Sequence, residues 1–478
     1  MTSASIGVRI LAFAVGVILA RLLTPDVFGI YAIVSFLVTM LESLRDLGIG
    51  AALIRETEVS QEHLRSVFTF QLLVAIGLGA TMFFLAPLLV TALQLSSSME
   101  WLIRLLVVTL ILSSFSSVPA ILLERQIRFR EIALVDIGGN LGFQFSALSF
   151  AWLGYGVWSF GFAAVIGGLI RTGAYYAQAR WRPGLSFDWG RVRGLLRFGL
   201  PFQGAGYVAL AGGAITPIVI GSYLGAAAVG YVGWAATLAL LPSIFVSGIS
   251  RVAFSAYSRI RGNREALRRA VEMSIRFGAI VMYPLLLLSM ALIPYIVEFV
   301  YLPKWAPGIP LFYLLALSGL FSPILGPVFQ LLYAEGKPGV TLRLTVLSTI
   351  IGWVVGVPLI LIFQARNYSV GGEPAGLLGW PVASLFGIVV VAAAYWEARK
   401  IIDIRLGGML MRIMLPAGVA AVVTRLASAW FVTDLFSLLA AGLMGLGLYA
   451  ALLLLIERSA LIRQIREIKN AAFGREAG

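Results

Sequence analysis

Cysteine is absent from this 478-residue sequence, and histidine occurs once, at His63. These absences exclude disulfide bonds, thiolate metal sites, cysteine nucleophiles and multi-histidine centres, so we expect neither a metal site nor a catalytic site. Charge is also scarce, because only 12% of the residues are charged while 60% are hydrophobic. A soluble domain has about 25% charged residues. The composition therefore predicts a protein whose solvent is a membrane.

The net charge of +14 comes from Lys and Arg residues that recur in short segments between apolar stretches, rather than in one soluble patch. Nucleic acid is therefore not an expected partner. The first apolar stretch is not followed by a cleavage site and a soluble body, so we expect a span and not a removed signal. About fourteen stretches can form transmembrane helices. They are residues 3–21, 28–48, 67–92, 101–122, 132–153, 157–178, 198–220, 228–248, 277–299, 308–333, 341–363, 376–397, 409–430 and 436–456.

The basic residues also predict the orientation. With a cytoplasmic N-terminus, cytoplasmic loops and helix ends hold 29 of the 36 Lys and Arg residues, five lie outside, and Arg9 and Arg171 lie within spans. The positive-inside rule then predicts that both termini are cytoplasmic. Trp101, Trp158 and Trp305 lie near predicted external ends, where an aromatic belt is expected.

The connections between the predicted spans are too short for a soluble catalytic domain. The longest, around residues 250–272, is a basic amphipathic connector. A membrane-embedded glycan polymerase or ligase is the enzyme alternative, and it would be expected to expose a substantial external loop. The chain also lacks a recognisable catalytic constellation. We therefore expect a transporter and no enzymatic activity.

Three short segments recur in order at nearly one spacing, which indicates an internal repeat. Residues 28–31 match 229–232 at an offset of 201, residues 62–65 match 265–268 at 203, and residues 85–90 match 292–297 at 207. The predicted fold is an all-α polytopic membrane protein with two six-helix lobes, related by a pseudo-two-fold axis along the membrane normal, and an appended helix pair. The predicted domains are an N-lobe at 1–185, a C-lobe at 186–405, and spans 13 and 14 with a cytoplasmic tail at 406–478.

Several sequence blocks carry a family resemblance. They are Leu19-Ala20-Arg21-Leu22-Leu23-Thr24-Pro25-Asp26-Val27-Phe28-Gly29, Asp46-Leu47-Gly48-Ile49-Gly50, Val118-Pro119-Ala120, Gly154-Tyr155-Gly156-Val157-Trp158, Leu196-Arg197-Phe198-Gly199 and Glu335-Gly336-Lys337-Pro338. With these blocks the chain resembles the polysaccharide-transport branch of the multidrug/oligosaccharidyl-lipid/polysaccharide exporter superfamily, the Wzx-type and teichuronic-acid-type flippases. The resemblance covers about residues 10–340 well. Two departures are the missing basic tail before the first span and the segment Thr216-Pro217-Ile218-Val219-Ile220-Gly221, where relatives often show an Asp.

The resemblance implies a flippase of the bacterial inner membrane that moves an undecaprenyl-diphosphate-linked oligosaccharide, such as an O-antigen or exopolysaccharide unit, by alternating access. It implies membrane lipids and a glycan polymerase as partners. No cofactor is expected, and a proton or sodium gradient is the candidate driving force. The missing Asp leaves an Asp-dependent coupling step at that position open.

A lipid diphosphate is a dense anion, and arginine binds phosphate with two parallel hydrogen bonds. The candidate headgroup contacts are Arg9, Arg45, Arg251 and Arg343. Each has an alternative reading: Arg9 can snorkel to the cytoplasmic headgroups, and the other three can anchor the topology.

Five further residues are candidates for polar cavity walls or for coupling. Glu42 and Asp46 share a helical face with Arg45, so a structural ion-pair cluster is an equal candidate. Asp136, Asn140 and Gln144 form one polar stripe in the fifth span, which in lipid must point inward. This stripe lines a cavity or makes interhelical hydrogen bonds.

Two other functions remain open on the sequence. A small-molecule cation or multidrug exporter of the same superfamily would share the fold, but it should favour acidic and aromatic cavity walls, whereas the charged residues in and near the predicted spans are mostly arginine. A peptidoglycan-precursor flippase would differ only in the headgroup that fits.

Overall fold

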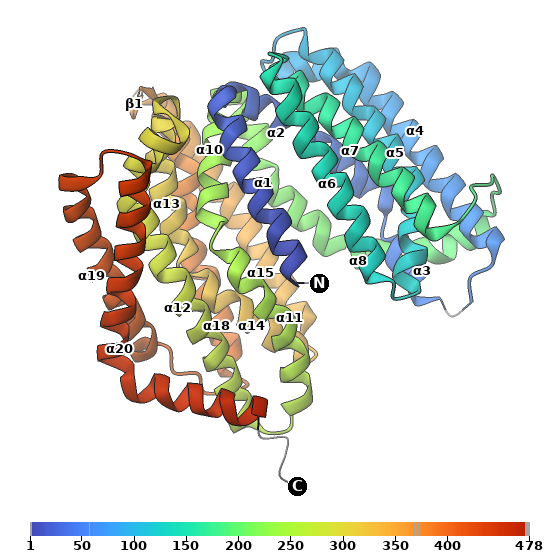
Figure 1. Cartoon of the computed structure of the whole chain (residues 1–478). Coiled ribbons are helices and arrows are strands. Elements are labelled where there is room, and N and C mark those ends of the chain that lie inside the picture. The colour runs from blue at the N-terminus through green and yellow to red at the C-terminus, as the bar shows by residue number, and fades with distance from the viewer. Residues whose placement is uncertain (1, 57, 367–368, 371, 474–478) are drawn as a thin grey trace. The chain divides into compact units, whose positions relative to one another are not determined.

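The computed structural model describes the backbone of residues 2–56, 58–366, 369–370 and 372–473. Nearly all of this backbone is helical, and the described strands form one antiparallel hairpin, β1 (Ser369–Val370) with β2 (Glu373–Pro374). The predicted all-α fold is therefore confirmed (Figure 1).

Contacts divide the chain into two units. Unit 1 comprises Met1–Trp234 and Thr345–Ala383, and unit 2 comprises Ala235–Leu344 and Ser384–Gly478. Unit 1 combines the helices of the predicted N-lobe with later segments that pack on them. The lobe boundaries drawn from the repeat remain a prediction.

Unit 1 begins with eight long or short α-helices joined by brief connections. They are α1 (Thr2–Leu22), α2 (Pro25–Asp46), α3 (Ile49–Arg55), α4 (Gln61–Ala92), α5 (Met99–Arg125), α6 (Phe129–Trp152), α7 (Trp158–Ala179) and α8 (Trp189–Gly213). Shorter elements complete it: π-helical η1 (Ile215–Ile220) and η4 (Gly352–Gly356), α9 (Gly221–Leu224), α16 (Val357–Ala365) and the 3-10 helix η5 (Ala375–Leu378). Three helices cross the boundary between the units: α10 (Ala226–Leu240), α15 (Pro338–Ile351) and α17 (Gly379–Leu385).

Unit 2 is built around the long helix α12 (Arg264–Ile296), against which α19 (Gly407–Phe431) and α20 (Leu435–Phe473) pack. Its other elements are α11 (Ser243–Ile260), η2 (Val297–Tyr301), η3 (Pro303–Gly308), α13 (Ile309–Gly319), α14 (Ser322–Ala334) and α18 (Gly387–Arg399). Arg276 of α12 and Glu457 of α20 form a buried ion pair at the kink of α20. This pair joins the last predicted span to the ninth.

Every one of the fourteen predicted spans coincides with helical segments. Within the described residues, nine helices are long and apolar enough to cross a membrane, or ten if the bent pair Pro303–Gly319 and Ser322–Ala334 is one span. The nine are Pro25–Arg55, Gln61–Ala92, Met99–Arg125, Trp189–Leu224, Arg264–Tyr301, Pro338–Ala365, Ala375–Arg399, Gly407–Phe431 and Leu435–Glu457. A polytopic membrane protein is confirmed, while the total of fourteen spans remains a prediction.

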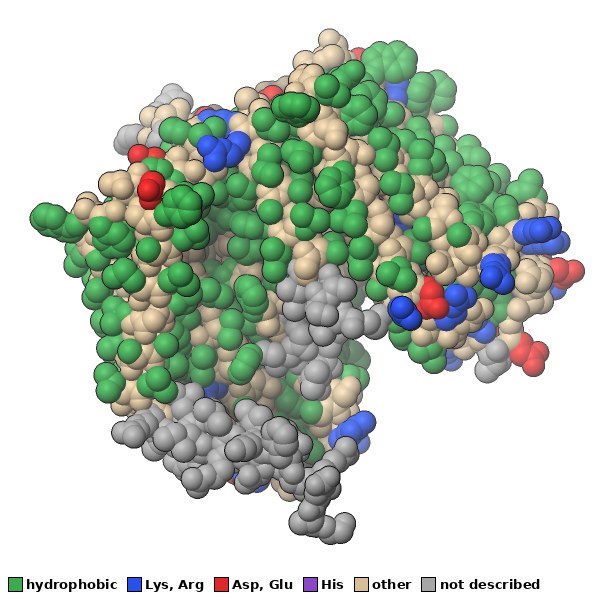
Figure 2. Space-filling model, viewed as in Figure 1, with side chains coloured by type: hydrophobic (Ala, Val, Ile, Leu, Met, Phe, Trp, Pro, Cys, Tyr) green, Lys and Arg blue, Asp and Glu red, His purple; other side chains and the backbone are tan. Residues whose placement is uncertain are grey.

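The outer surface has the character that lipid contact requires. Figure 2 shows hydrophobic side chains along the helix flanks, with charged side chains near helix ends. Large apolar side chains such as Phe84, Trp152, Trp430 and Phe436 are strongly exposed. Such continuous apolar exposure is unusual for a soluble monomer but normal where lipid tails cover the helices.

Side-chain caps define several helix starts. Ser60, Asp188 and Asn263 each accept a hydrogen bond from a backbone N–H three residues further on, at the start of α4, α8 and α12. Such a cap satisfies one of the N–H groups that have no partner within the helix. These polar starts fall at the predicted cytoplasmic ends of the spans.

A break after α2 separates it from the short helix α3. Leu47 and Gly48 both adopt left-handed backbone conformations, with φ of 49° and 72°. A Cβ on Gly48 would overlap the backbone of Gly199 in α8, so only glycine permits this approach. The break therefore fixes the end of α2, which carries Glu42, Arg45 and Asp46.

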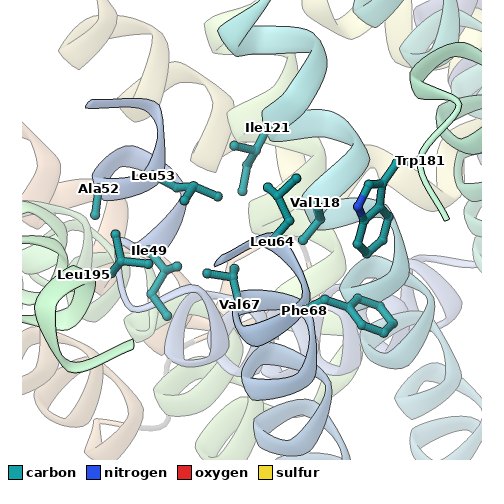
Figure 3. Close-up of a cluster of buried hydrophobic side chains, with 10 residues drawn as sticks. All are labelled: Ile49, Ala52, Leu53, Leu64, Val67, Phe68, Val118, Ile121, Trp181 and Leu195. Atoms are coloured by element: carbon teal, nitrogen blue, oxygen red, sulfur yellow. The ribbon is translucent and has the colours of Figure 1, made fainter. Parts of the chain in front are cut away.

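A buried apolar cluster holds α3 against its neighbours. Figure 3 shows Ile49 and Leu53 of α3 facing side chains of α4, α5 and α8, with Trp181 at one side of the cluster. Phe68 lies edge-on to the Trp181 ring at a centroid distance of 5.5 Å. Within a bilayer such a cluster is stabilised by close van der Waals packing rather than by removal from water. The cluster joins α3 to α4, α5 and α8.

Candidate functional site

A cavity of about 280 Å³ lies inside unit 1, between α2, α5, α6 and α7. Its walls are mainly hydroxyl-bearing, glycine and aromatic residues. The lining residues include Tyr31, Ser35, Thr39 and Glu42 of α2, Thr109, Ser113 and Ser116 of α5, Gly139, Asn140 and Phe143 of α6, and Gly167, Gly168, Arg171 and Thr172 of α7.

The cavity is polar within predicted transmembrane segments. A polar group in lipid needs a partner or water, so a polar cavity at this depth is a candidate functional site.

Arg45 lies beside this cavity as a tie between two helices. Its guanidinium is buried and donates from Nη1 to the Ser113 hydroxyl at 2.6 Å, to the Ser114 hydroxyl at 3.2 Å and to the Leu110 carbonyl at 3.4 Å. These acceptors all belong to α5. The geometry favours the structural alternative for Arg45, and its role as a headgroup contact stays a prediction.

Glu42 and Asp46 flank Arg45 on α2, as the spacing predicts. Glu42 is half-buried and lines the cavity, whereas Asp46 lies one turn further on, beside the break. Of the predicted three-residue cluster, Glu42 is therefore the member that the cavity can use.

The three residues of the polar stripe on α6 also differ in whether they line the cavity. Asn140 lines the cavity and donates to the Asp136 carbonyl oxygen at 2.8 Å. The Asp136 carboxylate lies 3.7 Å from Arg171 Nε of α7, and both side chains are about half exposed, at 49% and 44%. Gln144 lies further along α6 and is half-buried.

Arg171 is the site residue that the sequence reasoning left out of its candidates. Its position inside a predicted span was the signal that could have identified it, since an intramembrane charge is a functional candidate by default. Its Nε is buried without a hydrogen bond to the described residues. The guanidinium therefore has donor capacity left.

Glycines let α6 and α7 come close at this point. A Cβ on Gly167 would lie 2.9 Å from the Gly139 carbonyl oxygen, and a Cβ on Gly139 would lie 3.1 Å from Arg171 Nε. The small residues thus make room for the arginine between the two helices.

The other three headgroup candidates belong to α1, α11 and α15. Arg343 is exposed on α15, in unit 2. Arg9 and Arg251 belong to α1 and α11, but their side chains lie outside the described residues. All three remain predictions.

Two arginines near helix ends, Arg125 and Arg268, make structural contacts. Arg125 donates to the carbonyl oxygens of Leu53 at 2.5 Å and Glu56 at 2.6 Å, which satisfies the end of α3. Arg268 forms an ion pair with Glu265 at 2.6 Å. These residues stabilise the predicted cytoplasmic ends of the helices.

No group of three or more His, Cys, Asp or Glu residues is placed to hold a metal ion in the part of the chain that the structure describes. The oxygen atoms of the cavity belong mostly to hydroxyl groups. The site is thus a cavity within a helical bundle, with hydroxyl groups, one carboxylate and one arginine in its walls.

The apolar spans, with a cavity between four of the helices whose walls carry polar side chains, define a polytopic α-helical membrane protein. The chain belongs to the polysaccharide biosynthesis protein family, whose model matches residues 18–310. The suspected family is therefore confirmed.

Curated relatives cover most of the chain. The lipopolysaccharide biosynthesis protein WzxC of Escherichia coli (strain K12) is 24% identical over 370 residues, which are 76% of this chain and 72% of WzxC. The succinoglycan biosynthesis transport protein ExoT of Rhizobium meliloti (strain 1021) is 27% identical over 316 residues, 66% of this chain and 64% of ExoT. The teichuronic acid biosynthesis protein TuaB of Bacillus subtilis (strain 168) is 22% identical over 382 residues, 78% of this chain and 75% of TuaB.

Solved structures share the fold. The lipid II flippase MurJ superposes with a TM-score of 0.78 at 16% identity, over 96% of this chain and 98% of MurJ. An inward-facing multidrug resistance transporter of the MATE family gives a TM-score of 0.63 at 16% identity, over 81% of this chain and 93% of the transporter. At this identity the likeness concerns the fold alone.

Proposed function

We propose that this protein carries an undecaprenyl-diphosphate-linked oligosaccharide, the repeat unit of an O-antigen, an exopolysaccharide or a similar glycan, across the bacterial inner membrane by alternating access. Membership of the polysaccharide biosynthesis family supports this function. So do the names of relatives, which assign WzxC to lipopolysaccharide, ExoT to succinoglycan transport and TuaB to teichuronic acid.

The observation that carries the proposal is the polar cavity with Arg171 at its wall. A charged side chain within the bilayer is costly, so a half-exposed arginine beside a row of hydroxyl groups supports the passage of a polar solute. Arginine suits a polar glycan lipid because it stays charged and donates several hydrogen bonds.

The same observation ranks the alternatives. A transporter for cationic drugs would share the fold and would favour acidic and aromatic cavity walls. This cavity has one carboxylate, Glu42, and aromatic rings, but it also has Arg171, whose positive charge disfavours a cationic ligand. A glycan polymerase or ligase would need a catalytic constellation, and the sequence shows no recognisable one. The proposal is therefore a transporter without enzymatic activity. The lipid-linked substrate reaches the transporter from the membrane. A glycan polymerase would then use the exported repeat unit.

The proposed orientation places both termini in the cytoplasm, following the distribution of Lys and Arg. Outward movement of a charged lipid needs a driving force, and we propose a proton or sodium gradient. No cofactor is part of the proposal.

The test is deletion of the gene in its own host. We expect the lipid-linked repeat unit to accumulate on the cytoplasmic leaflet, the surface glycan to disappear, and drug susceptibility to stay unchanged. Re-expression of the wild-type chain should restore the glycan. A deletion strain without paralogues that keeps normal surface glycan, or that becomes drug-sensitive instead, would overturn the proposal.

A further inference from the structure

The walls of the unit 1 cavity can accept hydrogen bonds but have few protons to donate. Thr39 donates its hydroxyl proton to the Ser35 carbonyl at 2.9 Å, and Thr109 donates to the Leu106 carbonyl at 2.6 Å. Asn140 uses one of its two N–H donors on the Asp136 carbonyl. The hydroxyl oxygens keep lone pairs, and Glu42 adds a carboxylate that only accepts when ionised. A ligand for this cavity must therefore bring several donors.

The size of the cavity selects among donors. Its volume of about 280 Å³ is far more than the roughly 10–15 Å³ that a single bound water needs on the same measure. A bare monovalent cation needs a tight shell of oxygens, whereas the acceptors here are spread over four helices, α2, α5, α6 and α7. A ligand with several separated O–H groups fits this spread better than a single ion does.

One side of the cavity is apolar and aromatic. Tyr31 and Phe143 both line it, and their rings lie 6.2 Å apart at 32°. Tyr31 is held in place by stacking on Phe160 at 4.5 Å. A sugar ring matches such a wall, because it has a C–H face that packs on aromatic rings and hydroxyl groups around its rim. Arg171 can donate a hydrogen bond to the ring oxygen of a sugar or to the carboxylate of an acidic sugar.

We propose that this cavity is a glycan subsite, in which one sugar ring of the lipid-linked oligosaccharide binds during transport. Thr39, Glu42 and Asn140 accept hydrogen bonds from its hydroxyl groups, and Arg171 donates to it. The inference rests on the proposed function and adds to it a place where the sugar, as distinct from the diphosphate, is bound.

The natural absence of cysteine allows a direct test, because every introduced cysteine is the sole thiol in the chain. Thr39→Cys places a thiol on the cavity wall, and Ser97→Cys places a control thiol in the exposed connection between α4 and α5. The purified full chain is alkylated with N-ethylmaleimide, and the rate is followed by mass spectrometry. The probe is the lipid-linked repeat unit extracted from the deletion strain, and undecaprenyl diphosphate serves as the sugar-free comparison.

We expect the glycan-bearing lipid to slow alkylation of the Thr39→Cys variant by roughly tenfold at ten times its half-maximal concentration, since the unprotected fraction follows mass action. Undecaprenyl diphosphate should give little protection, and the Ser97→Cys control should react equally fast throughout. Should Thr39→Cys fold poorly, Ser35→Cys, one turn away on the same wall, takes its place.

A second variant tests the chemistry of recognition. Glu42→Gln in the Thr39→Cys background keeps the size of the side chain but removes the charged acceptor, and we expect the half-maximal concentration to rise about tenfold. Glu100→Gln is the matched control, because Glu100 pairs with Arg104 outside the cavity. This variant should leave the protection unchanged.

The outcomes separate the two proposals. If the deletion strain accumulates no lipid-linked unit, the proposed function fails. If the unit accumulates but does not protect the cavity thiol, or if undecaprenyl diphosphate protects it equally, the glycan subsite is wrong while the function stands. Protection by sodium ions or by acid pH alone would make the cavity a cation site and would also overturn the inference.

Discussion

Gly29 of α2 and Gly230 of α10 lie against each other, backbone to backbone. The two glycines occupy equivalent positions in the predicted internal repeat. A Cβ on Gly29 would overlap the carbonyl oxygen of Ala226 in α10, and a Cβ on Gly230 would overlap the carbonyl oxygen of Pro25 in α2. The step from 29 to 230 equals the step from 25 to 226, and it is the offset of 201 found in the sequence. Two copies of one motif therefore meet through the same atoms, as a local two-fold relation requires.

This contact predicts a sharp sensitivity to side-chain size. Gly29→Ala and Gly230→Ala should each destabilise the protein by about 1–3 kcal/mol or more, because the added methyl meets rigid backbone. Thermal unfolding in detergent measures the effect. Gly233→Ala is the matched control on α10, since a Cβ there has nothing within 4 Å. Equal stability of all three variants would show that the two helices are not this close.

Arg45 gives a second prediction, which separates anchoring from transport. Arg45→Lys keeps the charge but loses the geometry that binds Ser113 and Ser114, so we expect a loss of roughly 1.5–3 kcal/mol in stability. Transport by the folded fraction should persist at matched membrane abundance. Arg343→Lys, on the exposed surface of α15, serves as the control for stability. Unchanged stability with abolished transport would instead assign Arg45 to the substrate.

The Asp136–Arg171 pair can be tested as a thermodynamic cycle. Asp136→Asn or Arg171→Gln alone leaves one charge without its partner, which costs ~2.5–3.5 kcal/mol in a membrane unless water reaches it. The double variant should recover much of the lost abundance and stability, because no lone charge remains. Additive losses in the double variant would mean that the two side chains do not interact. Transport should stay impaired in the double variant, since the donor on the cavity wall is gone.

The topology provides a prediction that does not depend on the site. Connections at opposite ends of α5 must lie on opposite sides of the membrane if that helix spans it. In intact cells, a membrane-impermeant thiol reagent should label Ser97→Cys, before α5, but not Gln126→Cys, after it. Labelling of the second variant should appear after permeabilisation. The reverse pattern would invert the proposed orientation.

The cavity shows how far the sequence reasoning reached and where it stopped. Helical spacing placed Glu42 beside Arg45 and aligned Asn140 with Asp136, because neighbours on one helix face follow from the helical period alone. Arg171 could not be assigned to the same site, because its partner lies 35 residues earlier on another helix. Neither could Ser113 and Ser114 be matched to Arg45, since that pairing depends on how α2 packs on α5.

The sequence by itself determined the membrane environment, the positions of the helices and the family resemblance. These properties follow from local composition and period, since a span needs only enough consecutive apolar residues and a backbone that bonds to itself. Only the tertiary structure decided that Asp136 meets Arg171, that Arg45 is bound by α5, and that Gly29 meets Gly230. Which faces of the helices meet depends on close packing between residues distant in the chain, and an apolar span hydrophobic on every side carries almost no record of it.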